Sequence, residues 1–306
     1  MTAVVVLGGC AARQPRRSHA PSPTATEQAP ASAGPESLSE YMQKLRHLSA
    51  NVRPLTKQEA AETLESRDPA IAAELLLVAG EPTAERHRSL AETYRERGVL
   101  DAAYRHFKRA IALNPRDAAA YEGLARVWRD WGLPHLGLGD AHRAIYNAPR
   151  SASARNTLGT LLHALGLRDA ARESYSTAIE LDREAAYAFN NLCYLSFVEG
   201  KASQAIAECQ SALRVDPALA AARNNLALTY AAIGRLDLAR REFAAAGGAT
   251  TAAYNMGVVY LAERRFSAAA DEFEAARAAQ PRLVDADRRA RNARRLAELD
   301  RHAGGG

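Results

Sequence analysis

A period of 34 residues is the feature that most constrains how this chain can fold. The segment FNNLCYLSFVEG (residues 189–200) returns 34 residues later as RNNLALTYAAIG (residues 223–234). The same interval aligns a leucine column and a glycine column through five units: Leu90, Leu124, Leu158, Leu192, Leu226, and Gly98, Gly132, Gly166, Gly200, Gly234. A period of this length indicates a stack of small, similar units, none of which can bury its apolar face alone.

Each column has a physical reason. The glycine follows an amphipathic stretch, where a helix end often needs a left-handed conformation that glycine adopts at little cost. Two columns of small residues lie seven positions apart, hence on one face of the next helix, where two backbones approach closely. Those columns are Ala103, Gly137, Ala171, Ala205, and Ala110, Ala144, Ala178, Ala212. Each unit is therefore predicted to be a helix, a tight turn and a second helix.

These columns resemble the tetratricopeptide repeat, a helical hairpin that stacks into a right-handed superhelix. The resemblance implies an all-α fold, an α-solenoid of about six repeats with atypical capping helices. The six units are 84–117, 118–151, 152–185, 186–219, 220–249 and 250–283. The fifth unit is four residues short around AAAGGATTA, so we expect a tighter connection there, and the sixth has Arg264 in place of the turn glycine.

The flanking segments depart from the period. Residues 11–35 hold five prolines among alanine, serine and threonine, which predicts a flexible, partly extended tether. Residues 36–83 are predicted to form capping helices: an amphipathic helix over 36–48, then a helical hairpin built from LTKQEAAETLES and PAIAAELLLVAG. Residues 284–306 are predicted to form a basic helix and tail, and a cap is favoured there over a binding patch.

The first ten residues resemble a bacterial lipobox, with Leu7, Gly8, Gly9 and Cys10 in the required order and the tether directly after. The resemblance implies lipidation of Cys10, anchoring on the periplasmic side of a bacterial membrane, and, because Ala11 follows the cysteine, the outer membrane. No positive charge precedes the apolar run, and nine residues are few for a signal peptide. Either the true start lies upstream of Met1 or the resemblance is accidental.

Little in the sequence predicts chemistry. It contains no nucleophile elbow, no zinc-protease motif and no phosphate-binding loop, so neither an enzyme nor a bound cofactor is expected, and no metal ligand set is complete. The net charge of +5 is modest for 306 residues, which does not favour a nucleic-acid binder. Cys193 and Cys209 occupy two inward-facing positions of the fourth unit. They are interpreted as free core thiols or, in an oxidising periplasm, as a disulfide.

In the repeat family, the first helices line a concave groove. Carrying the family's groove positions onto this chain predicts a groove that is charged at its amino-terminal end, amide-rich in the middle and more apolar beyond. Peptide contact is favoured for Asn191, Asn225 and Asn255, and a bond to the backbone of the preceding loop is favoured for Asn190 and Asn224. The candidate groove residues are Asn156, Tyr187, Asn190, Asn191, Tyr194, Phe197, Asn224, Asn225, Tyr254 and Asn255.

The predicted function is a non-enzymatic protein-interaction scaffold. Its partners would be a protein or an extended peptide in the groove and a membrane through the lipid, and self-association stays open. By resemblance to lipoproteins of this design, of which the tight-adherence pilus assembly lipoprotein is the nearest type, it would assist assembly of a pilus or secretin. Two alternatives remain: a cytoplasmic adaptor in which Cys10 is incidental, and the substrate-recognition partner of a separate enzyme chain.

Overall fold

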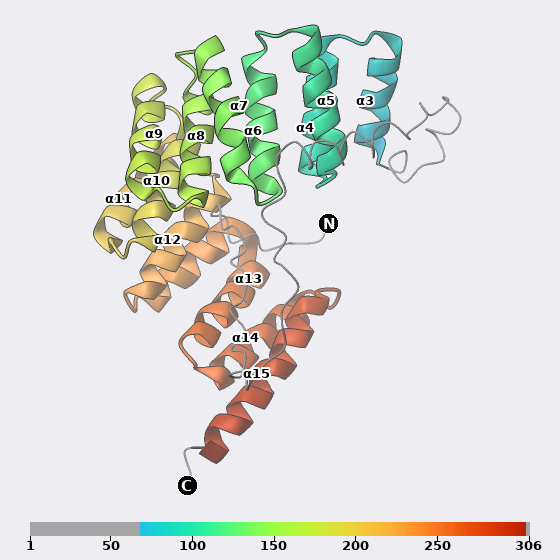
Figure 1. The fold of residues 1–306 in the computed structure, drawn as a ribbon. Coiled ribbons are helices and arrows are strands. Elements are labelled where there is room, and N and C mark those ends of the chain that lie inside the picture. Colours follow the sequence, from blue (N-terminus) through green and yellow to red (C-terminus); the bar gives the residue numbers. More distant parts are fainter. Residues whose placement is uncertain (1–67, 304–306) are drawn as a thin grey trace, which may run out of the picture.

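The computed structural model describes residues 68–303, which form thirteen helices, α3 to α15, and no strand. Helix α3 (Pro69–Gly80) comes first, and consecutive pairs of helices follow it. Figure 1 shows the pairs stacked side by side along a curved path that ends with a single helix. The pairs are α4 (Ala84–Glu96) with α5 (Leu100–Leu113), α6 (Ala118–Asp130) with α7 (Pro134–Asn147), α8 (Ala152–Ala164) with α9 (Arg168–Leu181), and α10 (Ala186–Val198) with α11 (Ala202–Val215).

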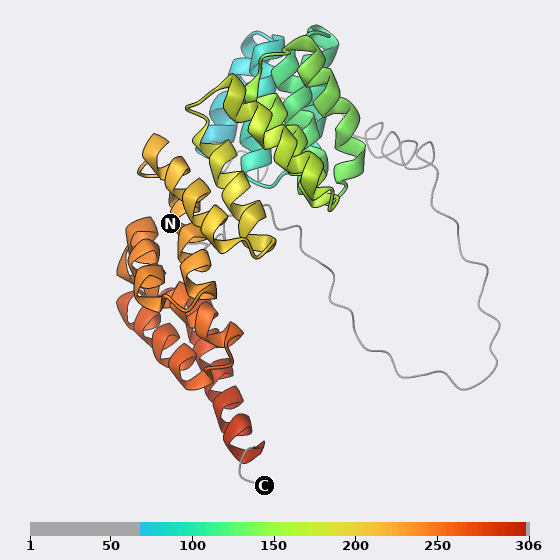
Figure 2. The same ribbon diagram turned by 90° about the vertical axis from the view of Figure 1, so that its left-hand side faces the viewer.

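The later helices continue this arrangement. Helix α12 (Ala220–Ala232) pairs with the first part of α13 (Leu236–Ala262), the second part of α13 pairs with α14 (Phe266–Ala279), and α15 (Val284–Ala303) ends the stack. A view turned by 90° shows α12 to α15 continuing the stack away from the block formed by the first helices (Figure 2). The prediction of an all-α solenoid of stacked helical hairpins is confirmed.

The turn between the two helices of each hairpin has the conformation that the glycine column predicts. Gly98, Gly132, Gly166, Gly200 and Gly234 all have φ between 73° and 79°. Arg264 occupies the equivalent place in the sixth unit and has φ 60°. Left-handed backbone is cheap for glycine and unfavourable for a residue with a Cβ atom, so one turn of the stack is built at some cost in stability.

The shortened fifth unit produces a local break inside α13. Gly247 (φ −163°, ψ 20°) and Gly248 (φ 83°, ψ −177°) leave helical geometry, although the helix runs on at both sides. The expected tight connection is therefore two residues long. Because Gly248 has positive φ, glycine is the residue that best permits the bend.

Side-chain size is matched between the two helices of each hairpin. In the third unit Gly159 of α8 faces Tyr175 of α9, and a Cβ atom on Gly159 would lie 2.6 Å from the tyrosine ring. In the sixth unit Gly257 faces Phe273 in the same way, at 2.8 Å. Tyr175 and Phe273 are fully buried. In these two hairpins a glycine on the first helix makes room for the large ring on the second, as close packing of the interior demands.

The predicted end caps fall partly within the described residues. Of the amino-terminal cap, the structure describes α3, whose Ile71 is buried while Leu76 and Leu77 are exposed. The predicted helix over 36–48 and the segment LTKQEAAETLES lie outside the described residues, as do the tether and Cys10. At the other end, α15 buries a stripe of alanines against α14: Ala286, Ala290 and Ala293. None of the helices within 68–303 combines the length and hydrophobicity that a membrane crossing requires.

Candidate functional site

The first helices of successive hairpins contact one another in series: α4 with α6, α6 with α8, α8 with α10, and α10 with α12. We call the surface that these helices form, continued by the second part of α13, the first-helix row. Every candidate groove residue lies on this row. The candidate residues therefore lie on one series of contacting helices, and burial decides which of their side chains the row exposes.

Asparagine side chains bond across this row in a fixed register. The Nδ2 atom of Asn191 donates to Oδ1 of Asn156 over 2.7 Å. Asn225 donates to Asn190 over 2.9 Å, and Asn255 donates to Asn224 over 3.5 Å. In the second and third units the same two positions hold Glu122 and Thr157, whose hydroxyl donates to the carboxylate over 3.0 Å. The first partner of each pair thus accepts a hydrogen bond from the next unit along the stack.

These pairs correct part of the predicted groove. Asn225 and Asn255 are 0% and 1% exposed, so their amides cannot line a binding surface as expected. Asn190 and Asn224, at 8% and 9%, are also buried, and each bonds to the side chain of the next unit rather than to loop backbone. The physical reason is the close approach of neighbouring first helices, which brings two short amides within hydrogen-bonding distance. Tyr254, at 7%, is buried as well.

The amino-terminal end of the row is charged, as expected, and its charges are bonded to one another. Arg95 binds Glu92 on its own helix over 2.6 Å and reaches Asp130 at the end of α6 over 2.9 Å. Arg126 of α6 returns to Glu92 over 3.2 Å. Arg129 binds Asp130 and also donates to the hydroxyl of Thr160 on α8 over 3.1 Å. This network ties the first three hairpins together along the row.

The carboxyl-terminal part of the row is partly exposed and has no charged residue at the positions that correspond to Glu92, Arg95, Arg126 and Arg129. Tyr194 and Phe197 of α10 are half-buried, with ring centroids 6.5 Å apart, and His163 of α8 lies 5.5 Å from Tyr194. Leu228 of α12 and Val258 of α13 continue the same face and are also half-buried. Tyr187, at the start of α10, is 38% exposed. Of the predicted groove residues, Asn156, Tyr187, Asn191, Tyr194 and Phe197 are the ones that a partner could reach.

The two cysteines of the fourth unit are joined. The structure places a disulfide between Cys193 of α10 and Cys209 of α11, with Cα atoms 5.1 Å apart. Both residues are fully buried. They take the two facing positions that glycine and tyrosine hold in the third unit, Gly159 and Tyr175. Of the two interpretations of this pair, the structure therefore contains the disulfide.

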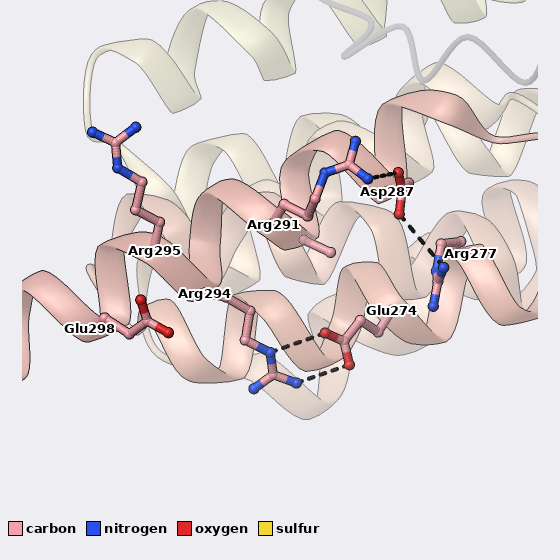
Figure 3. Close-up of a pocket in the computed structure, with 8 residues that line it drawn as sticks. Glu274, Arg277, Asp287, Arg291, Arg294, Arg295 and Glu298 are labelled. Atoms are coloured by element: carbon pink, nitrogen blue, oxygen red, sulfur yellow. Dashed lines mark hydrogen bonds and ion pairs between the residues drawn. The ribbon is translucent and has the colours of Figure 1, made fainter.

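A pocket of about 380 Å³ lies between α14 and α15, and charged side chains line it (Figure 3). Arg294 binds Glu274 over 2.9 Å, while Arg277 and Arg291 both bind Asp287. Arg291 and Arg294 are the eighth and eleventh residues of α15, positions that Gly257 and Tyr260 hold in the sixth unit. These arginines leave no apolar face for another helix to pack against, which supports the interpretation of α15 as a cap.

Sequence reasoning missed a histidine pair in the first hairpin. Nδ1 of His87 on α4 lies 3.0 Å from Nδ1 of His106 on α5, and His106 stacks on Tyr94 with ring centroids 5.6 Å apart. The pKa of His106 is lowered from 6.5 to about 4. Burial is the main cause, and the charges of His87 and Arg105 add to it. Burial and Arg109 also lower the pKa of His87. One feature of the sequence could have indicated this pair. The two histidines are 19 residues apart, and the same separation brings Arg223 and Glu242 together in the fifth hairpin.

We predict that this pair makes the first hairpin sensitive to acid. Since both folded-state pKa values lie below 6.5, the stabilisation is complete above pH 6.5 and is lost as the pH falls towards 4. The expected loss from His106 is about 2–3 kcal/mol of unfolding free energy. His106→Phe should reduce this loss, and the exposed His135→Gln should not. Urea unfolding at several pH values, monitored by the fluorescence of Trp128 and Trp131 on the next hairpin, measures it, and equal acid sensitivity of both variants would contradict the assignment.

Comparison with known proteins agrees with the fold. The tetratricopeptide repeat family model matches residues 152–184, within the third unit. No curated protein matches the chain. Solved structures do: the anaphase-promoting complex hetero-tetramer Cut9–Hcn1 matches with TM-score 0.59 and 18% identity, covering 83% of this chain and 51% of that one. A tetratricopeptide repeat protein from Parabacteroides merdae matches with TM-score 0.55 and 15% identity, covering 83% and 98%.

A third structure, PilF from Pseudomonas aeruginosa, matches with TM-score 0.50 and 19% identity over 73% of this chain and 97% of that one. At these identities the likeness shows the fold alone. The fold is that of a tetratricopeptide repeat solenoid. Tetratricopeptide repeat proteins serve as scaffolds that bind peptides or other proteins, and the fold is typically not enzymatic.

Proposed function

We propose that this protein is a non-enzymatic scaffold that holds a segment of a partner protein against the first-helix row. The observation that carries the proposal is the row itself, which is continuous from α4 to α13 and exposes aromatic and aliphatic side chains over its second half. Binding surfaces are enriched in such residues because they bury large apolar areas at a small cost in conformational entropy.

We also propose that the scaffold is anchored by lipid on Cys10 to the periplasmic face of a bacterial membrane, favouring the outer membrane. The order Leu7, Gly8, Gly9, Cys10 and the proline-rich segment after it support this anchor. The buried disulfide between Cys193 and Cys209 supports the same compartment, because disulfides persist in the oxidising periplasm and are rare in the cytosol. In that setting the scaffold would assist assembly of an envelope complex such as a pilus or a secretin.

The anchor is tested by the intact mass of the protein expressed from its native locus, with any upstream sequence included. The expected result is a chain that begins at Cys10 and carries acyl mass, and a Cys10→Ala variant should lack that mass. An unmodified chain that retains the residues before Cys10 would refute the anchor. The scaffold would then be assigned to the cytoplasm as an adaptor or as the recognition partner of a separate enzyme.

A further inference from the structure

The first-helix row changes its chemistry between the third and fourth hairpins. The ninth and twelfth residues of each first helix lie on the same side of the row. In the first two hairpins all four are charged: Glu92, Arg95, Arg126 and Arg129. In the third they are Thr160 and His163. In the last three hairpins all six are uncharged and almost all apolar: Tyr194, Phe197, Leu228, Ala231, Val258 and Leu261.

The charged half has little left to offer a ligand. Glu92 is shared by Arg95 and Arg126, and Asp130 is shared by Arg95 and Arg129. Two of these ion pairs, Arg126 with Glu92 and Arg95 with Asp130, join neighbouring hairpins, and all of them are partly buried. A charged ligand would therefore have to replace bonds that already hold the stack together. Such a replacement gains little free energy, because each new pair is formed at the expense of an existing one.

The uncharged half offers few of the groups that bind an extended peptide backbone. An added extended chain requires free donors and acceptors along its length. Here Asn225 donates to Asn190, and Asn255 donates to Asn224, so these four amide side chains are directed at each other and are buried. The half-buried Asn191 uses its Nδ2 atom on Asn156 of the third hairpin. What the face exposes instead is apolar area, contributed by half-buried rings and aliphatic side chains.

A surface of this kind suits the apolar side of an amphipathic helix, which buries residues at positions i, i+3, i+4 and i+7 and satisfies its own backbone. The dimensions agree. Neighbouring packed helices lie roughly 8–10 Å apart, so three first helices span about 20 Å. A helix rises about 1.5 Å per residue, so about 13 residues cover that distance.

We infer that the face formed by Tyr187, Tyr194, Phe197, Leu228 and Val258 binds the apolar side of an amphipathic helix supplied by a partner protein. This inference rests on the proposed scaffold function and names the half of the row that binds and the chemistry that it recognises. Complementarity of charge carries it: none of these five side chains is ionic, so they accept the uncharged side of a helix, while the partner's polar side stays in solvent.

The test is a selection from a library of random 16-residue peptides displayed on phage, performed with the full chain. We expect selected peptides with aromatic and aliphatic residues at helical spacing. Hydrogen exchange should show that they protect α10, α12 and the second part of α13. Leu228→Glu should weaken their binding about tenfold or more. Tyr187→Ser, at a more exposed position, provides a second variant that the fold tolerates, and Leu299→Glu on α15 is the control that should not change binding.

Different failures have different meanings. Selection of charged peptides that protect α4 and α6 would overturn the inference and leave the scaffold function intact. Absence of any selected peptide would overturn both. Protection of the face in the free protein that depends on protein concentration would assign it to a second copy of the chain. The amphipathic helix predicted over 36–48 could also cover the face. Protection in the free protein would be assigned to that segment if it disappears when serine replaces its apolar residues, Leu38, Tyr41, Met42, Leu45 and Leu48. Either result would overturn the choice of a partner helix.

Discussion

Replacing Asn225 by aspartate should destabilise the protein by about 3–5 kcal/mol at pH 7, the largest effect that we expect from a single isosteric change. Asn225 is fully buried, and its Nδ2 atom donates to Oδ1 of Asn190 over 2.9 Å. An aspartate has no N–H group to donate. It would instead place a buried negative charge beside the Asn190 oxygen, so one hydrogen bond becomes a repulsive contact without solvent to screen it.

The penalty should depend on pH in a defined direction. Burial raises the pKa of such a carboxyl above its unfolded value of about 3.9. The destabilisation is therefore complete above the folded-state pKa and declines as the pH falls through it, because a protonated carboxyl can again donate to Asn190. Urea denaturation of both proteins between pH 4 and pH 8 measures this trend.

Asn191→Asp is the matched control for this substitution. Asn191 occupies the equivalent position one hairpin earlier and donates to Asn156 in the same register, but it is only half-buried. Solvent can reach a carboxylate there, so the expected loss is about 1 kcal/mol or less. Equal losses for the two variants would contradict the assignment of the buried asparagine pairs as the bonds that hold successive hairpins together.

The fold was predictable because its determinants are local and repeated. A glycine with positive φ is needed at every hairpin turn, and the column from Gly98 to Gly234 states that requirement five times in the sequence. Likewise, the break at Gly247 and Gly248 follows from a unit four residues short. Each of these features depends on backbone conformation within one unit, which a single sequence records directly.

The side-chain pairs of the row were harder to predict because they join residues of different units. The recurring Asn-Asn dipeptide identified the right residues, but two adjacent amides were interpreted separately. In the structure the first asparagine of a pair accepts from the next unit and the second donates to the preceding one. The two asparagines that bond to each other are 35 residues apart, one more than the period. A comparison of equivalent positions pairs residues that are 34 apart, so it does not examine them together. The ion pair between Arg95 and Asp130, which are also 35 residues apart, was missed for the same reason.

The disulfide between Cys193 and Cys209 should contribute about 3 kcal/mol to stability, since it closes a loop of 16 residues in the unfolded chain. We expect a reductant to lower the free energy of unfolding of the native protein by that amount. The double variant Cys193→Ala with Cys209→Ala should show no response to reductant. This comparison separates the bond from the packing of the sulfur atoms, because the variant lacks the same side-chain volume in both conditions.

A count of thiols decides whether the bond forms. With Cys10 unmodified, the denatured protein should present one reactive thiol without reductant and three after reduction, because the chain contains three cysteines. Lipidation of Cys10 would lower both counts by one and leave the difference of two unchanged. Three thiols before reduction would show that Cys193 and Cys209 are free. The disulfide would then no longer support an oxidising compartment, and the placement in the periplasm would rest on the residues around Cys10 alone.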